Sequence, residues 1–98
     1  MKQFIRQNFG IFSGKERYKV TLSFSPQTSR WVKEQVWHKS QKTKIDKKGR
    51  LTLTIPVSDF REIKREILKF GADVEVISPA ALKKEIKEEI KKMQKIYR

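Results

Sequence analysis

One short stretch, residues 30–41, holds most of the side chains in this sequence that could do chemistry. Two tryptophans, a histidine and a glutamine stand there among an arginine and several lysines. Aromatic rings stack on unpaired bases and cations contact phosphates, so this mixture is typical of sites that bind single-stranded nucleic acid. The alternative is that these side chains support the fold, with the histidine making a hydrogen bond within a loop. We expect one of the two tryptophans to lie in the core. The candidate nucleic-acid or effector site comprises Arg30, Trp31, Lys33, Trp37, His38, Gln41, Lys42 and Lys44.

The reactive groups that catalysis needs are scarce in this sequence. His38 is the sole histidine and cysteine is absent, which excludes disulfides, thiol nucleophiles and zinc–thiolate sites. Glutamates near the C-terminus recur with lysines, as Glu88 does with Lys92, in the i, i+4 pattern of a solvated helix. A small acyl-phosphate hydrolase is disfavoured because the N-terminal loop shows no glycine-bounded arginine cradle for a phosphate. We therefore expect a protein that is not an enzyme and that uses no cofactor and no metal.

The net charge of +13 is large for 98 residues, and it favours polyanionic partners: nucleic acid first, acidic lipid or acidic protein second. Residues 30–50 contain eight basic and two acidic side chains, a local net charge of +6, whereas residues 51–78 carry −1. A lysine-rich surface is also common in thermophile proteins, where it serves ion-pair networks. Both interpretations stay open, but the uneven distribution locates the excess charge around residues 30–50 and at the two ends of the chain.

Length and hydropathy limit the class of protein. Ninety-eight residues, 37% of them hydrophobic, suffice for one small core. No stretch is long enough to span a bilayer, and polar residues interrupt the first twelve positions, so we expect neither a membrane partner nor a signal peptide. These features predict a single cytoplasmic domain.

The hydrophobic period changes along the chain in the order strand, helix, strand, strand, helix, strand, and a separate helix follows. Residues 17–24 and 50–57 alternate apolar and polar side chains, as half-buried strands do. Residues 39–46 are polar and indicate an edge strand protected by lysines, joined to the next strand by a turn at residues 46–49. This order predicts an α+β fold: a ferredoxin-like βαββαβ sandwich with an additional C-terminal helix.

Serine, aspartate, proline and glycine mark the expected helix ends. The predicted helices start at Ser25–Pro26, at Ser58 or Asp59, and at Ser78–Pro79; the first ends near Val36, the second ends at Gly71, and a strand at residues 72–77 precedes the third. Asp59 and Glu62 also stand at the spacing of a capping box. In the last helix an apolar stripe must bury against a sheet face, the N-terminal segment or another chain. The stripe consists of Leu82, Ile86, Ile90, Met93 and Tyr97.

In such a fold the two inner helices cover one face of the sheet and leave the other face to partners. The free face is predicted to be basic, rich in hydroxyl groups and without aromatic residues, so we do not expect bases to stack on it. Its predicted residues are Lys19, Thr21, Ser23, Lys42, Lys44, Arg50, Thr52 and Thr54.

Four segments together resemble the C-terminal extension of bacterial WYL-domain transcription regulators, known as the WCX domain. They are Tyr18–Pro26, Arg30–Gln41, Lys48–Leu53 and Phe70–Pro79, and the resemblance covers about residues 17–97 in order. Residues 8–14 are similar to the linker that leads from the WYL domain into this extension. The resemblance implies that residues 1–16 are a linker segment from a missing upstream domain and that residues 17–98 form a WCX-like ferredoxin-fold domain.

For such a domain the resemblance implies dimer contacts and effector sensing, while duplex DNA is bound by an N-terminal winged helix-turn-helix that this sequence lacks. It implies as partners the WYL domain of the same or a partner chain, a second copy in a homodimer, and a single-stranded nucleic-acid effector. The leading hypothesis is a regulatory and dimerisation domain of a transcription regulator whose basic surface helps to bind an anionic effector. The alternative is a stand-alone basic nucleic-acid-binding protein.

Overall fold

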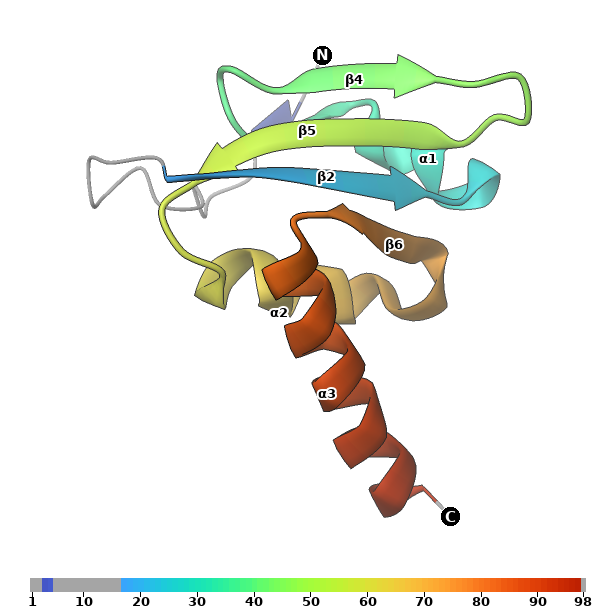
Figure 1. The fold of residues 1–98 in the computed structure, drawn as a ribbon. Helices are drawn as coiled ribbons and strands as arrows, with labels where there is room; N and C mark the ends of the chain where they lie inside the picture. Colours follow the sequence, from blue (N-terminus) through green and yellow to red (C-terminus); the bar gives the residue numbers. More distant parts are fainter. Residues whose placement is uncertain (1–2, 5–16, 98) are drawn as a thin grey trace.

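The computed structural model describes residues 3–4 and 17–97 of the chain. Within these residues, four strands form a main sheet, two short strands form a separate pair, and the longest helix comes last (Figure 1). The elements are β1 (Gln3–Phe4), β2 (Tyr18–Phe24), α1 (Pro26–Val32), β3 (Gln35–Val36), β4 (Lys42–Ile45), β5 (Leu51–Val57), α2 (Arg61–Phe70), a 3₁₀ turn (Gly71–Asp73), β6 (Val74–Ser78) and α3 (Ala80–Ile96). The remainder of the expected linker at residues 1–16 lies outside the described residues.

The main sheet has the strand order β4–β5–β2–β6, and all of its pairings are antiparallel. Two βαβ units, β2–α1–β4 and β5–α2–β6, interleave in this sheet, because a strand of one unit separates the two strands of the other. The predicted α+β class, a ferredoxin-like sandwich with an additional C-terminal helix, is confirmed. Strand β4 lies at the edge of the sheet, as its lysines predict, but it begins at Lys42 rather than near Lys39.

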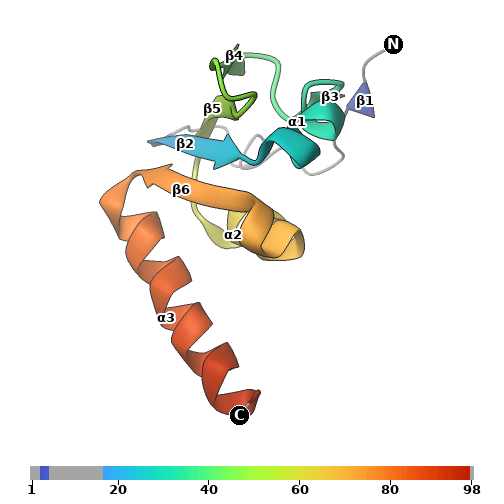
Figure 2. The ribbon, with the colours of Figure 1, turned by 90° about the vertical axis from the view of Figure 1, so that its right-hand side faces the viewer.

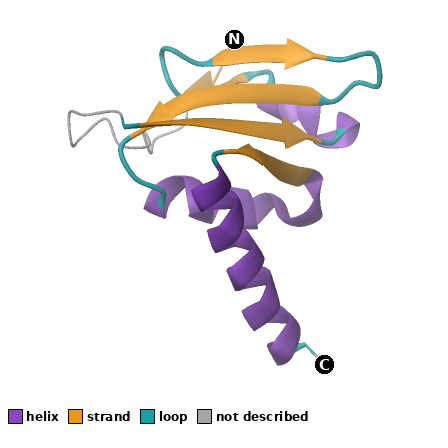
Figure 3. Cartoon of the chain, viewed as in Figure 1, coloured by secondary structure: helices purple, strands orange, loops and turns teal. Residues whose placement is uncertain are grey.

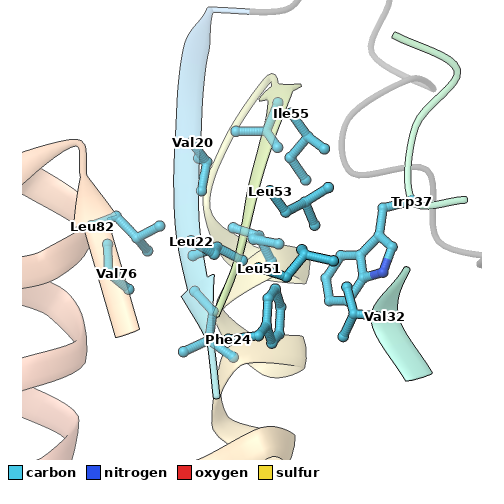
Figure 4. Close-up of a cluster of buried hydrophobic side chains, with 13 residues drawn as sticks. Val20, Leu22, Phe24, Val32, Trp37, Leu51, Leu53, Ile55, Val76 and Leu82 are labelled. Atoms are coloured by element: carbon cyan, nitrogen blue, oxygen red, sulfur yellow. The ribbon is translucent and has the colours of Figure 1, made fainter. Parts of the chain in front are cut away.

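The core lies between the sheet and the helices α1 and α2. Burial alternates strictly along β5: its apolar residues from Leu51 to Val57 are fully buried, and the residues between them are partly exposed. Burying a side chain of this size contributes about 1.5–3 kcal/mol, so the alternating pattern of β5 determines which face of the sheet is covered. Figure 4 labels further members of the core: Val20, Leu22, Phe24, Val32, Trp37, Val76 and Leu82. Ile63 and Ile67 of α2 also belong to it.

Helix α1 starts where the sequence predicts and ends earlier. Ser25 occupies its N-cap, and the Ser25 hydroxyl accepts a hydrogen bond from the backbone N–H of Thr28 at 3.3 Å. The helix ends at Val32, so the predicted extension to Val36 is wrong. Residues 35–36 form β3 instead, which pairs in parallel with β1. This pairing uses backbone groups that a longer helix would need for its own hydrogen bonds.

The start of α2 also differs from the prediction. Phe60 occupies its N-cap and makes no side-chain cap, so neither Ser58 nor Asp59 caps this helix and no capping box forms with Glu62. The Asp59 carboxylate instead accepts hydrogen bonds from Arg61, at 3.0 Å from the backbone N–H and at 3.1 Å from the guanidinium. Because the Asp59 carboxylate bonds to Arg61, two residues along the chain, it does not reach the backbone N–H of Glu62, as a capping box would require.

The end of α2 lies where the sequence predicts it, whereas the cap of α3 differs from the prediction. Gly71 follows α2 with a φ of +59°, in the region that favours glycine, so the predicted end of this helix is confirmed. Ser78 does not cap α3, because it is the last residue of β6 and Pro79 occupies the N-cap. Ser78 therefore belongs to the sheet, and the prediction that it caps α3 is wrong.

Helix α3 projects away from the sheet after its first turns (Figure 2, Figure 3). Leu82 is fully buried and Ile86 packs against the core. Next to them, the Lys64 ammonium of α2 lies 3.7 Å from a carboxylate oxygen of Glu85 and 3.9 Å from one of Glu89. Within the described residues, the predicted apolar stripe is therefore covered only near its start.

Candidate nucleic-acid interface

Trp37 lies in the connection between α1 and β4 and is fully buried. Its ring centroid is 6.0 Å from that of Phe70 and 5.8 Å from that of Phe24, and the two phenylalanine centroids are 5.2 Å apart. Such aromatic pairs add about 0.5–1.5 kcal/mol beyond the burial of their area. The expectation that one tryptophan lies in the core is confirmed, and Trp37 is that residue (Figure 4).

Hydrogen bonds from Gln41 shape the loop around Trp37. The Gln41 Oε1 atom accepts the backbone N–H groups of Trp37 at 2.6 Å and of His38 at 3.2 Å. The Gln41 amide nitrogen donates to the backbone carbonyl of Gln35 at 3.1 Å. The indole N–H of Trp37 donates to Gln35 Oε1 at 3.2 Å. One glutamine side chain therefore satisfies three backbone groups, one in β3 and two in the loop that follows it.

His38 is also buried, and it takes part in the same loop. Its Nδ1 atom accepts the backbone N–H of Ser40 at 2.9 Å, so the neutral ring carries its proton on Nε2. The arrangement agrees with the structural interpretation, in which the histidine satisfies a loop hydrogen bond. The geometry gives His38, Trp37 and Gln41 a role in holding the loop, and direct contact between these residues and a ligand stays a prediction.

Trp31 on α1 has the opposite environment. Its side chain is 73% exposed, although the next residue, Val32, packs in the core. Arg30 and Lys33 are exposed close to it in the sequence. An exposed indole beside a guanidinium can stack on an unpaired base while the cation contacts a phosphate. An open hollow of about 320 Å³ here is lined by Pro26, Gln27, Arg30 and Trp31.

The turn between β4 and β5 packs against the start of α1. Its Asp46 carboxylate accepts the backbone N–H groups of Lys48 and Arg50, both at 2.9 Å. Gly49 has a φ of +87°, and a Cβ atom at this position would lie only 3.3 Å from the Cβ atom of Pro26. Only glycine meets both conditions without strain. The turn therefore holds its exposed lysines beside the residue that begins the Trp31 hollow.

The sheet face opposite the helices is basic and rich in hydroxyl groups. The register aligns Lys42 with Thr54 and Lys44 with Thr52 across β4 and β5. Thr54 also lies opposite Thr21 of β2, and their hydroxyl oxygens are 3.3 Å apart. The alternation of the strands thus places the residues predicted for the free face together: Lys19, Thr21, Ser23, Lys42, Lys44, Arg50, Thr52 and Thr54.

Two details of this sheet face favour contact with an anion. The Nε atom of Arg50 donates to the hydroxyl of Ser23 at 2.9 Å, which fixes the guanidinium over the sheet. A hollow of about 150 Å³ opens nearby, where ammonium and hydroxyl groups provide hydrogen-bond donors for phosphate oxygens. Its lining residues are Lys19, Ser40, Lys42, Thr54, Ile55 and Pro56.

The fold separates the predicted site residues into three places. Arg30, Trp31 and Lys33 lie on the exposed side of α1, Trp37, His38 and Gln41 lie in the buried loop, and Lys42 and Lys44 lie on the free sheet face. These residues were predicted to form one site because they are close in the sequence. In the structure, α1 packs on the face of the sheet opposite to Lys42 and Lys44. The list of site residues left out Lys19 and Arg50, which the alternation of their strands could have added.

No helix in residues 17–97 combines the length and the apolar character needed to cross a membrane. Among the same residues, no three histidine or acidic side chains gather as a metal site would require.

A family model described as the WCX domain matches residues 16–94, which is most of the chain. The matched range includes the whole main sheet, α1, α2 and most of α3. A search of curated proteins found no match.

Proposed function

The chain belongs to the WCX domain family, and on that basis we propose that it is the C-terminal regulatory domain of a WYL-type transcription regulator. In this proposal the domain binds an anionic effector, single-stranded nucleic acid, and takes part in dimer contacts. Its direct partner is the WYL domain of the same or a partner chain, and a separate domain of the regulator binds duplex DNA. The role is binding rather than catalysis, in the cytoplasm.

The exposure of Trp31 is the observation that carries the effector proposal. A tryptophan that is 73% exposed on a helix contributes little to folding, and keeping its large apolar surface in water is unfavourable. Tryptophan and arginine are also the residues most enriched where binding energy concentrates in interfaces. Because Arg30 and Lys33 flank Trp31, the partner that fits this surface carries both a flat apolar group and negative charge.

The two basic surfaces suit different parts of a nucleic-acid strand. At α1 the indole offers its face to a base, a contact worth about 1–3 kcal/mol per base in single-strand binding proteins. The free sheet face offers lysines, an arginine and threonine hydroxyls but no aromatic ring, so it suits phosphates. Strand β4 is the edge between these two sides, and a flexible single strand that passes over it can contact both.

Titration of a labelled single-stranded oligonucleotide at several salt concentrations tests the effector proposal. Release of counterions predicts that the logarithm of the affinity falls with the logarithm of the salt concentration, with a slope of about −0.7 per neutralised phosphate. A duplex of the same length should bind more weakly, because it exposes no base for stacking. If no single strand binds to this chain or to its parent protein at low salt, the effector proposal is wrong.

Tryptophan fluorescence can locate the contact, because one indole is exposed and the other is buried. We expect the oligonucleotide to quench the fluorescence of the natural chain and of the Trp37→Phe variant, in which Trp31 is the remaining emitter. The Trp31→Phe variant should keep its fluorescence, since Trp37 lies in the core. Quenching that persists in Trp31→Phe and disappears in Trp37→Phe would move the site to the buried loop.

A stand-alone basic nucleic-acid-binding protein is the second candidate, and the net charge of +13 favours it. It predicts that the isolated chain binds nucleic acid as tightly as the natural gene product does. The natural reading frame distinguishes the two candidates. A WYL domain encoded upstream of Met1 in the same frame would favour the regulator.

A further inference from the structure

The second half of α3 has an apolar side that is largely uncovered by the described part of the chain. The exposed fractions are 52% for Ile90, 41% for Met93, 74% for Ile96 and 79% for Tyr97. Single exposed apolar residues are common on protein surfaces, but a contiguous stripe on a projecting helix marks an interaction surface. The helix extends well beyond the sheet in two views (Figure 1, Figure 2).

A groove between α2, β6 and α3 continues this surface toward the core. It has a volume of about 370 Å³, and apolar side chains of all three elements line it, among them Leu68, Val74 and Ile86. Ile90 and Met93 line this groove and also a shallower hollow that extends to the end of α3. The groove and the exposed half of the helix are therefore one continuous apolar surface.

We infer that a second copy of this chain docks on this surface, with the two α3 helices antiparallel. The inference rests on the dimer contacts of the proposed function, and it names the surface and the orientation that produce them. Two properties of α3 support an antiparallel pair. The spacing of its apolar residues is the same in both directions, and its charge distribution disfavours the parallel arrangement.

The spacing of the stripe suits an antiparallel pair. Its last residues are separated by four, three and four positions, an order that is the same from either end; they are Ile86, Ile90, Met93 and Tyr97. A two-fold axis between positions 91 and 92 sets Ile90 of one copy against Met93 of the other, and Ile86 against Tyr97. Each tyrosine ring then meets the groove beside Ile86 of the other copy. The resulting interface is self-complementary, as the two-fold symmetry of a dimer requires.

The charges of α3 favour the same orientation. The acidic residues of α3 all precede Ile90, in a half that holds three glutamates and three lysines, whereas the half that follows carries three lysines and no acid. Parallel helices would place the two lysine-only halves side by side, where like charges oppose association. Antiparallel helices place each lysine-only half beside the glutamates. The residues concerned are Glu85, Glu88 and Glu89 in the first half and Lys91, Lys92 and Lys95 in the second.

Sedimentation equilibrium of the 98-residue chain over a wide range of protein concentrations tests the inference. We expect a monomer–dimer equilibrium whose Kd rises by about 100-fold or more in the double variant Ile90→Gln/Met93→Gln. The matched control is Lys91→Gln/Lys92→Gln, which introduces the same residues on the other side of the same helical turn. This control should change the Kd far less than the double variant, because it leaves the apolar stripe intact and exposed ion pairs contribute at most about 1 kcal/mol. A natural chain that stays monomeric, or a dimer unaffected by Ile90→Gln/Met93→Gln, overturns the inference.

Introduced cysteines report the orientation, because the chain contains none of its own. Under mild oxidation, a mixture of Ile86→Cys and Tyr97→Cys chains should form the mixed disulfide faster than either chain links to itself. Self-linked Tyr97→Cys dimers without a mixed product would show parallel helices and overturn the antiparallel assignment.

A basic amphipathic helix can also bind an acidic membrane, and vesicle-binding measurements distinguish this partner from a second copy of the chain. A monomeric chain that binds phosphatidylserine vesicles through Ile90 and Met93 overturns the inference. The effector proposal is tested separately, because the Ile90→Gln/Met93→Gln variant keeps Trp31 and both basic surfaces. If this variant still binds single strands with the natural salt dependence, a failure to dimerise leaves the effector proposal standing.

Discussion

Two tryptophans six positions apart lie in contrasting regions of the molecule. Trp31 faces solvent on α1 between basic residues, whereas Trp37 lies in the core against Phe24 and Phe70. Helix α1 ends at Val32, directly after Trp31, and the chain passes through β3 before it reaches Trp37. The path of the backbone, rather than the residue type, therefore decides which ring supports the fold and which is available to a partner.

Truncation of each tryptophan should give the largest difference between the two regions. We expect Trp37→Ala to lower the free energy of unfolding by about 3–5 kcal/mol, because it leaves a cavity in the aromatic cluster. Trp31→Ala should lower it by less than about 0.5 kcal/mol, as surface substitutions generally do. Urea unfolding followed by circular dichroism measures both values. Equal losses would show that Trp31 also supports the fold.

Replacement of Gln41 tests whether the buried loop depends on its hydrogen bonds. Gln41→Met keeps the size of the side chain but removes the acceptor for the backbone N–H groups of Trp37 and His38. We expect a loss of about 1–3 kcal/mol, the cost of leaving such groups unpaired in a buried site. The matched control is Gln27→Met on the exposed side of α1, which should change stability little. A similar loss in both variants would contradict the role of Gln41.

Binding measurements should separate the aromatic from the cationic part of the exposed region. Trp31→Ala should weaken oligonucleotide binding by about 10-fold or more and leave the slope of affinity on salt unchanged, since it removes stacking and no charge. Lys42→Gln/Lys44→Gln should instead make the slope shallower by about 1.4, because two phosphates lose their partners. If Trp31→Ala alters the slope and the lysine variant does not, the two roles are assigned wrongly.

The smallest effect is expected at an exposed ion pair outside both regions. The Arg61 guanidinium, by its hydrogen bond, holds the pKa of the Asp59 carboxyl below its usual range, and the backbone N–H of Arg61 adds to this effect. A carboxyl whose pKa is lowered by folding adds stability above its unfolded pKa, and this stability is lost as the pH falls through the folded pKa. Arg61→Gln should therefore cost little at neutral pH, and the cost should vanish in strong acid. Thermal unfolding at both pH values checks it; a cost that grows in acid would contradict this assignment.

Local signals in the sequence were sufficient for most of the fold. The alternation along β5 determines which of its residues are buried, and Ser25 caps α1 because its side chain is close to the N–H group it accepts. The turn at Gly49 depends on a backbone conformation that glycine favours. In each case the deciding contact lies within a few residues or follows the period of the element itself.

Other features depend on contacts that no local pattern contains. The early end of α1 follows from pairing of Gln35–Val36 with Gln3–Phe4, more than thirty positions away. Asp59 had two local options, and the hydrogen bond to Arg61 prevailed over the cap. For the candidate site, the sequence identified the residue types but grouped them by proximity along the chain. Whether a side chain in residues 30–44 is buried or exposed follows from the three-dimensional path alone.

The close approach of Gly49 to Pro26 has a mechanical consequence for the exposed region. Because Gly49 lies this close to Pro26, the hairpin tip is held beside the start of α1, and we expect its lysines and the indole of Trp31 to keep a nearly constant separation. A strand that reaches one of them meets the other at a fixed separation, and no loop has to become ordered first. Binding at this corner should therefore lose little conformational entropy in the protein, so that most of the interaction energy is retained as affinity.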